Sequence, residues 1–254
     1  MDLKTAAARL GVHYQTAYRW VREGSLSAMK IGPTYEVDPY EIERLLRQRS
    51  VPVPPPMRSR VRSWDMHLLR LYDALISGDE RMARQVVERL RDGGQETVEI
   101  CERLVTPALR RIGDAWAEGH VSLVEEHRAS AMCTRLLAGI SVHPRGRPRG
   151  VAVVTTVPGE AHELPGMMAS MALRADRWQV HHLGTQVPYD QLAALVRRER
   201  ATLVVLSVTH TRVQRDALHC ADRVRRELGV RALTGRPGAT LTDLIHGAKQ
   251  AAAA

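Results

Sequence analysis

The stretch V-A-V-V-T-T-V-P-G-E-A-H-E-L-P-G-M-M-A-S-M, from Val151 to Met171, decides the fold of the C-terminal part of the chain. Its opening run is apolar and β-branched throughout, which is typical of a strand buried on both faces of a parallel sheet. Pro158 and Gly159 end that strand, and an apolar helical pattern follows. His162 is therefore placed on the loop at the carboxyl end of a parallel strand, where open α/β sheets bind their ligands.

The loop around His162 has the features of a metal site. The imidazole offers a ring nitrogen to a metal, and Glu160, two residues earlier, is placed to fix its tautomer. Gly166 allows the backbone to approach a large flat ligand. A histidine that follows a strand is more often solvated than bound to a metal, so this stretch alone leaves both interpretations open.

Strands and helices alternate from about residue 150 to residue 250, after a Pro/Arg/Gly-rich segment at 141–150. This alternation predicts a doubly wound, Rossmann-like parallel sheet. A dinucleotide-binding domain is the main competitor, but no G-x-G-x-x-G follows the first strand. The strands are expected at 151–157, 179–183, 202–208 and 230–233, and the helices at 164–174, 189–198 and 212–227. Residues Gly184, Ser207, Thr209 and Gly235 then lie on loops at the same edge as His162.

Residues 1–50 show the pattern of a winged helix-turn-helix DNA-binding domain. A helix over 3–10 ends at Gly11, a second helix runs over about 14–23, and 28–37 reads as a hairpin turning at 32–33. Asp38 and Pro39 then open a third helix. The order and spacing of these elements resemble excisionase-like and MerR-like domains. A small helical module for protein interaction is the alternative.

The second helix of this domain carries side chains suited to reading bases. Ala17, Trp20 and Val21 recur at helical spacing and are expected to be buried. The remaining face offers amide, guanidinium and aromatic groups to a major groove, and Lys30 on the wing offers a phosphate contact. The residues expected to bind DNA are Tyr14, Gln15, Thr16, Tyr18, Arg19, Arg22 and Lys30.

The middle of the chain is predicted to be helical. A Pro-rich linker at 51–59 precedes a pattern over 60–140 that predicts a four-helix bundle, with Pro107 as a candidate kink. Trp116 ends one helix, and the pair Glu126 and His127 lies in the next. These side chains are candidates to converge over a ligand at one end of the bundle. A core tryptophan, a solvated Glu-His pair and a bundle that only spaces or dimerises remain the alternatives.

Composition favours a polyanion as partner. The chain has 254 residues, a net charge of +9 and only three lysines, so its basic side chains are almost all arginine. A soluble basic protein with a solvated arginine surface is the alternative. The three cysteines have no C-x-x-C spacing, and no apolar run approaches the length of a membrane span. We therefore expect a cytoplasmic protein without a membrane partner.

Taken together, the pieces resemble the CarH/LitR family of cobalamin-dependent, light-responsive transcriptional repressors. The resemblance covers nearly the whole chain and implies that a cobalt corrinoid, adenosylcobalamin, lies between bundle and α/β domain. By resemblance, His162 is the lower axial cobalt ligand, and the nucleotide tail passes Ser207, Thr209 and Gly235. Trp116, Glu126 and His127 would cover the upper face.

The sequence departs from the family pattern at several positions. The usual H-x-x-G is replaced by H-E-L-P-G, with Pro165 where glycine is expected; Arg236 replaces a second glycine, and the α/β unit stops after one helix beyond Gly238. Ala117 replaces the histidine that binds cobalt after photolysis in the best understood members. His120 would share the face of Trp116 if the helix persists, and is the only nearby substitute.

The interpretation is a non-enzymatic repressor that binds a double-stranded DNA operator and forms a homo-oligomer, a dimer or tetramer. Light would change its oligomeric state and DNA affinity through bound adenosylcobalamin. A light-independent regulator of the same architecture, which has lost cobalamin or binds another tetrapyrrole, is one alternative. A corrinoid carrier subunit of a methyltransferase is the other.

Overall fold

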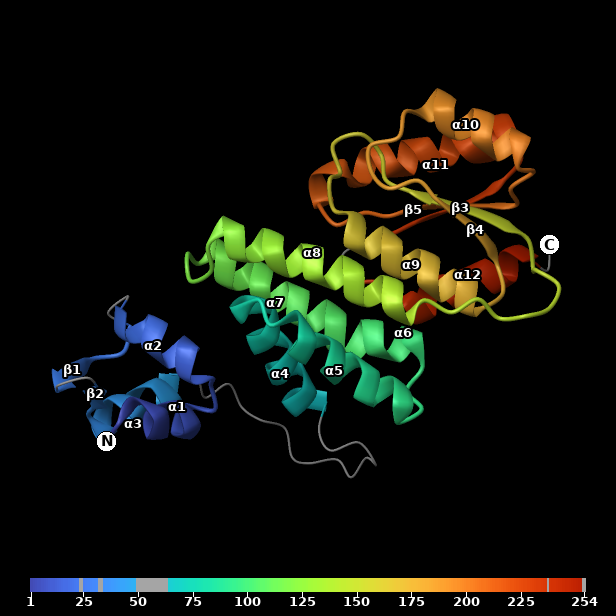
Figure 1. The fold of residues 1–254 in the computed structure, drawn as a ribbon. Coiled ribbons are helices and arrows are strands. Elements are labelled where there is room, and N and C mark those ends of the chain that lie inside the picture. The colour runs from blue at the N-terminus through green and yellow to red at the C-terminus, as the bar shows by residue number, and fades with distance from the viewer. Residues whose placement is uncertain (23–24, 32–33, 49–63, 237, 253–254) are drawn as a thin grey trace.

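The computed structural model describes residues 1–254 except 23–24, 32–33, 49–63, 237 and 253–254. Three parts follow one another along the chain: a small N-terminal unit, a helical bundle and an α/β unit (Figure 1). The expected linker at 51–59 lies outside the described residues. Within the described residues, no helix is both long enough and apolar enough to cross a membrane.

The N-terminal unit has the predicted helix-turn-helix and hairpin. Gly11, with a φ of 69°, ends the first helix and permits the tight turn into the second. The imidazole of His13 caps the second helix, since its Nδ1 accepts a hydrogen bond from the backbone N–H of Gln15 at 3.3 Å. The hairpin strands pair antiparallel as expected, whereas the predicted turn at 32–33 lies outside the described residues. The elements are α1 (Leu3–Leu10), α2 (Tyr14–Arg22), β1 (Ala28–Ile31), β2 (Thr34–Val37) and α3 (Pro39–Gln48).

The bundle follows with the helical pattern that the sequence predicts. Asp79 caps α5 by accepting a hydrogen bond from Met82 N–H at 2.9 Å. The expected irregularity at Pro107 takes the form of a π-helical segment that ends at Val105, two residues earlier, since proline has no N–H to continue the helical hydrogen bonds. The elements are α4 (Trp64–Ser77), α5 (Glu80–Asp92), α6 (Thr97–Ile100), the π-helix η1 (Cys101–Val105), α7 (Thr106–Ala117) and α8 (Leu123–Ile140).

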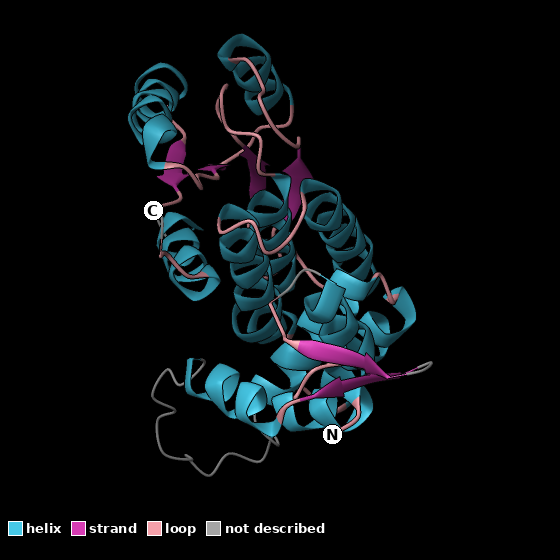
Figure 2. Ribbon diagram, turned by 90° about the vertical axis from the view of Figure 1, so that its left-hand side faces the viewer, coloured by secondary structure: helices cyan, strands magenta, loops and turns pink. Residues whose placement is uncertain are grey.

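The α/β unit contains a four-stranded, fully parallel sheet in the order β4-β3-β5-β6. Figure 2 shows the sheet between helices on both faces, and the labels in Figure 1 identify α10 and α11 on one side and α9 and α12 on the other. The doubly wound fold class is therefore confirmed. The elements are β3 (Val151–Thr155), α9 (Glu163–Ala175), β4 (Gln179–His182), α10 (Tyr189–Arg198), β5 (Leu203–Leu206), the 3₁₀-helix η2 (Thr211–Val213), α11 (Gln214–Leu228), β6 (Arg231–Thr234) and α12 (Leu241–Ala252).

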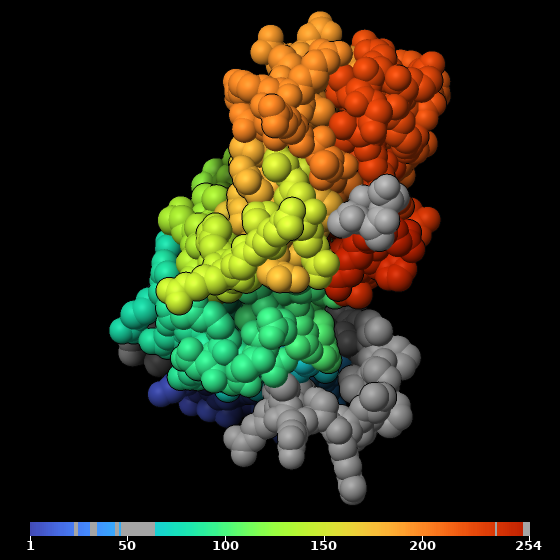
Figure 3. Space-filling model, turned by 90° about the vertical axis from the view of Figure 1, so that its right-hand side faces the viewer, coloured from blue at the N-terminus to red at the C-terminus, as the bar shows by residue number. Residues whose placement is uncertain are grey.

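Helix α9 belongs to two cores at once. Met168 and Met171 pack in the core of the bundle, whereas Ala169 and Leu173 pack against the sheet. Helix α12 adds a polar link, because the backbone N–H of Thr242 donates to Glu102 at 2.8 Å. Figure 3 shows the α/β unit and the bundle in continuous contact on that side of the molecule. The two parts therefore form one packed body.

Candidate functional site

Glu160 is the structural centre of the loops that leave β3 and β5. Its carboxylate is fully buried, and Oε2 accepts hydrogen bonds from the backbone N–H groups of Thr209 at 2.7 Å and His210 at 3.0 Å. Oε1 faces His162, accepting from its backbone N–H at 3.1 Å and lying 2.6 Å from its Nδ1. These contacts join two loops that leave adjacent strands.

The charge on Glu160 is strongly stabilised by these partners. Burial alone raises the pKa of the carboxyl group, but hydrogen bonds from His210, His162 and Thr209 outweigh it and bring the pKa to about 2. Glu160 is therefore a carboxylate at neutral pH and accepts hydrogen bonds only. It follows that Nδ1 of His162 carries the proton.

His162 is consequently prepared as a ligand. With the proton on Nδ1, its Nε2 keeps an unshared lone pair, which is the form of imidazole that binds a metal. The side chain is 47% exposed, so part of the ring faces solvent. The position of Glu160 behind the imidazole is the arrangement that the E-x-H spacing predicts.

A second imidazole, which is not among the site residues predicted from the sequence, stands beside this one. The ring of His210 meets the ring of His162 edge to face, with ring centroids 4.7 Å apart. His210 follows β5, 48 residues further along the chain, and only the pairing of β3 with β5 brings the two together. Its ring restricts the directions in which the His162 ring can turn.

The rest of the carboxyl edge is closely fitted. A Cβ added to Gly235 would stand 3.0 Å from the backbone nitrogen of Val208, so only glycine fits there without a shift. A Cβ on Gly166 would stand 3.4 Å from Nε2 of His182, whose pKa burial lowers. Ser207 is buried behind Gly166, whereas Thr209 is exposed. Gly184 has a φ of 71°, and its carbonyl accepts a hydrogen bond from Thr155 Oγ1 at 3.2 Å.

The predicted bundle residues lie on the two helices that flank the turn between α7 and α8. Trp116 lies in the last turn of α7 and is 48% exposed, so it is not a core tryptophan. In the first turns of α8, Glu126 Oε2 lies 2.5 Å from Nδ1 of His127, and Ser130 Oγ donates to Glu126 Oε1 at 2.8 Å. In Figure 1 the N-terminal half of α8 lies on the side toward which the carboxyl edge of the sheet faces.

His120 is not placed as the sequence interpretation required. Helix α7 ends at Ala117, and Gly119 follows with a φ of 74°, so the helical spacing that would put His120 on the face of Trp116 does not continue. The imidazole is 73% exposed and its Nδ1 lies 3.2 Å from Glu118. Because the helix ends before Gly119, His120 does not share the helical face of Trp116 as predicted.

The candidate DNA-binding face of α2 is partly open and partly covered. Tyr14, Gln15, Arg22 and Lys30 are exposed, and Thr16 is half-buried. Tyr18 was expected to face outward, but it is partly buried and its ring meets that of Tyr35 edge to face. Arg19 is 26% exposed and pairs with Glu125 of the bundle. Ala17 is buried, and Trp20 and Val21 are partly buried.

Comparison with known proteins defines the class of these domains. Models described as B12 binding domains match residues 68–139 and residues 150–243, and a helix-turn-helix domain model matches residues 1–50. The chain is therefore a relative of B12-binding proteins that also carries a helix-turn-helix domain, and a corrinoid is the cofactor that its domains indicate.

Particular relatives come from two groups. The HTH-type transcriptional repressor CarH of Myxococcus xanthus is 30% identical over 128 residues, 50% of this chain and 42% of CarH, so less than half of that protein is matched. Dimethylamine corrinoid protein 2 of Methanosarcina acetivorans is 24% identical over 183 residues, 68% of this chain and 83% of that protein. The solved structure of Methanosarcina barkeri monomethylamine corrinoid protein shares the fold, with a TM-score of 0.58, 14% identity, and coverage of 74% of this chain and 99% of that one.

The residues present fit a corrinoid. His162 offers an exposed imidazole held from behind by a buried carboxylate, which suits a cobalt ligand. An added Cβ on Gly235 would stand 3.0 Å from the backbone nitrogen of Val208, whereas one on Gly166 would lie at ordinary contact distance from His182 and Ser207. Pro165 lies in the first turn of α9, where a missing N–H costs no helical hydrogen bond.

Proposed function

We propose that this protein is a DNA-binding transcriptional repressor that senses light through bound adenosylcobalamin. The observation that carries the proposal is the pair Glu160 and His162 on the same chain as a helix-turn-helix unit. Glu160 keeps the imidazole of His162 in the tautomer that can bind cobalt. The helix-turn-helix unit offers exposed polar side chains on α2.

The proposed signal depends on the upper face of the site. Adenosylcobalamin supplies a cobalt–carbon bond that light breaks. Trp116 and His127 are exposed at one end of the bundle, and Glu126, next to His127 in the sequence, is partly buried. These side chains would register whether a group occupies the space beside them. The response would be a change of oligomeric state, which alters DNA affinity because two joined DNA-binding units bind far better than one.

The test uses the purified full chain with adenosylcobalamin, kept in the dark. Absorbance and molecular mass by light scattering are recorded before and after illumination. Co-elution of the corrinoid and a light-dependent change of mass support the proposal, and a mass that does not respond to light refutes its sensory part. Binding to DNA should fall steeply with salt, and Arg22→Ala should weaken it, because both effects follow from phosphate and base contacts.

Two other functions have specific support. Ala117 beside Trp116, and the exposed position of His120, favour a regulator of the same architecture that does not respond to light. Similarity to 83% of a dimethylamine corrinoid protein favours a corrinoid carrier for a methyltransferase. The carrier predicts transfer of a methyl group from the bound corrinoid and no DNA binding, so a DNA titration separates it from both regulators.

A further inference from the structure

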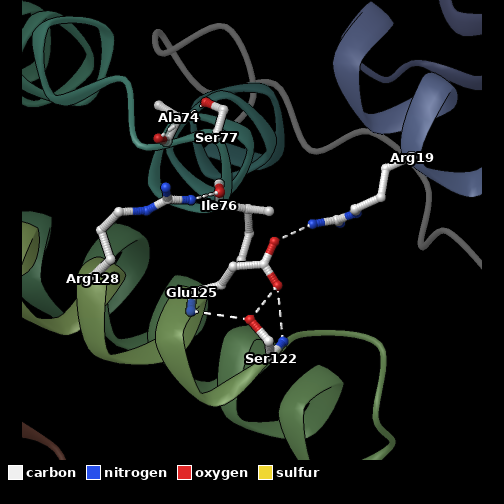
Figure 4. Close-up of polar contacts among 7 residues, drawn as sticks. All are labelled: Arg19, Ala74, Ile76, Ser77, Ser122, Glu125 and Arg128. Carbon is white, nitrogen blue, oxygen red and sulfur yellow. Dashed lines mark hydrogen bonds and ion pairs between the residues drawn. The ribbon is translucent and has the colours of Figure 1, made fainter.

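An ion pair joins the DNA-reading helix to the bundle. Nη1 of Arg19, on α2, lies 2.6 Å from Oε1 of Glu125, in the first turn of α8 (Figure 4). The two residues are 106 positions apart in sequence. Their side chains are only 26% and 23% exposed, so the contact is partly shielded from solvent.

The carboxylate of Glu125 is held in place from the bundle side. Its Oε2 lies 2.8 Å from both the backbone nitrogen and Oγ of Ser122, and the backbone N–H of Glu125 donates to Ser122 Oγ in return. This reciprocal capping box fixes the carboxylate and leaves Oε1 for Arg19. One turn further on, Arg128 donates to the carbonyl of Ile76 at 2.5 Å and ties α8 to α4 (Figure 4).

The electrostatics of the pair agree with this geometry. Burial raises the pKa of Glu125, but the hydrogen bonds from Ser122 and the positive charge of Arg19 outweigh it, so the pKa falls below its ordinary value. Glu125 is therefore charged at neutral pH. A carboxylate held in this way offers Arg19 the same kind of partner that a phosphate or a guanine edge offers on DNA.

We infer that the bundle docks the DNA-reading helix in a closed form, in which Glu125 occupies Arg19 and so competes with DNA. The inference rests on the proposed function, since it takes Arg19, which the sequence predicts to bind DNA, as one of the DNA contacts. In the closed form Arg19 contacts the bundle and cannot reach a base edge. Binding of DNA therefore requires the N-terminal unit to leave α8.

The location of Glu125 joins this competition to the candidate corrinoid site. Glu126 and His127, which were assigned to the upper face, are the next two residues of α8. They share the first turns of one helix with Glu125, so a displacement of that helix end changes both contacts. Occupancy of the site and docking of the DNA-reading helix are thereby coupled through one short segment.

The decisive variant is Glu125→Gln in the full chain. Glutamine is accepted at this position of a capping box, so the helix start is kept while the ion pair is removed. Glu80→Gln is the matched control, because the partners of Glu80 among the described residues, Arg84 and Arg135, both belong to the bundle. Small-angle X-ray scattering without DNA reports docking, and fluorescence titration with a random duplex of about 30 base pairs at low salt reports DNA affinity.

We expect Glu125→Gln to increase the radius of gyration and to tighten DNA binding about threefold to tenfold, the range expected when a partly shielded ion pair is lost from a closed state. Raising the salt concentration should shift the scattering of the wild type toward that of the variant. Glu80→Gln should change neither measurement. Unchanged scattering and unchanged affinity in Glu125→Gln would overturn the inference. A scattering change without DNA binding by either protein would leave the docking intact and refute the proposed function instead.

Discussion

Replacing Glu160 with glutamine should have two effects at once. It should destabilise the α/β unit, and it should prevent His162 from acting as a metal ligand. The carboxylate accepts four hydrogen bonds, two at Oε1 from His162 and two at Oε2 from Thr209 and His210. The glutamine amide has one acceptor oxygen and one NH₂ group. In either orientation of the amide, the NH₂ group faces two N–H donors that the carboxylate oxygen had accepted from. The better orientation turns NH₂ toward His162, whose ring can accept through Nδ1 only if the proton moves to Nε2. That nitrogen then has no lone pair for cobalt.

The magnitude follows from the buried hydrogen bonds. One buried N–H without an acceptor costs about 1–3 kcal/mol, and charge-assisted bonds contribute about 1.5–3 kcal/mol each. The fall of the Glu160 pKa from 4.5 to about 2 corresponds to about 3 kcal/mol of stabilisation of the charged carboxylate in the folded state. This is an upper value for the effect of the substitution, because the imidazole of His162 is partly exposed and water weakens its interaction with the carboxylate. We therefore expect Glu160→Gln to lower the free energy of unfolding by about 2–3 kcal/mol.

Urea unfolding of the ligand-free chain measures this change. The control is Glu163→Gln, which removes the same charge from an exposed position at the start of α9 and should lower stability by no more than about 1 kcal/mol. The contribution of Glu160 is fully present above about pH 4.5 and is lost as the pH falls toward 2, because the folded state holds its pKa near 2. The wild type should lose this stability over that range, and Glu160→Gln should not. A difference between variant and wild type below about 0.5 kcal/mol at pH 7 would refute the reasoning.

Three further predictions concern other parts of the chain. Gly150→Ala should lower the free energy of unfolding in urea by about 1–3 kcal/mol, because the added Cβ would stand 2.5 Å from Thr202 Oγ1 and 2.9 Å from Trp178 Cζ3. Gly113→Ala is the control, and it should raise the free energy of unfolding by about 0.5–1 kcal/mol, because the added Cβ lies in open space on α7. Burial raises the pKa of Cys101 and of Cys133 to about 12, so a thiol reagent at pH 8 should label only Cys220 in the folded chain, and mass spectrometry showing early labelling of the other two would contradict this. His210→Ala should raise the dissociation constant for cobalamin about threefold to tenfold in an absorbance titration, because His162 loses its neighbouring ring, whereas the exposed His219→Ala should leave it unchanged.

Local patterns were sufficient to predict the elements and part of the candidate site. The β-branched run from Val151, the helix-ending Gly11 and the helix start at Asp38 and Pro39 all act within a few residues, so their effects can be read directly from the sequence. Glu160 and His162 are two positions apart, and their contact follows from that spacing. Signals of this range depend little on the rest of the chain.

Contacts between distant segments could not be predicted in the same way. His210 reaches His162 only because β3 and β5 are neighbours in the sheet, and Arg19 meets Glu125 across 106 residues. The outward position assigned to Tyr18 was wrong because the hairpin folds back and places Tyr35 against it. The expectation that His120 shares the helical face of Trp116 was wrong for a local reason, since α7 ends at Ala117 and Gly119 has a left-handed backbone.

The double membership of α9 limits how a large ligand enters. One face of this helix completes the bundle through Met168 and Met171, and another completes the sheet layer through Ala169 and Leu173. Separating the bundle from the sheet would expose both sets of side chains to solvent at the same time. Each of the larger side chains, Met168, Met171 and Leu173, contributes about 1.5–3 kcal/mol when buried, so this separation would cost several kcal/mol. On the proposed function, a corrinoid would therefore reach His162 past the loops that leave β3 and β5, and not through a separation of the bundle from the sheet.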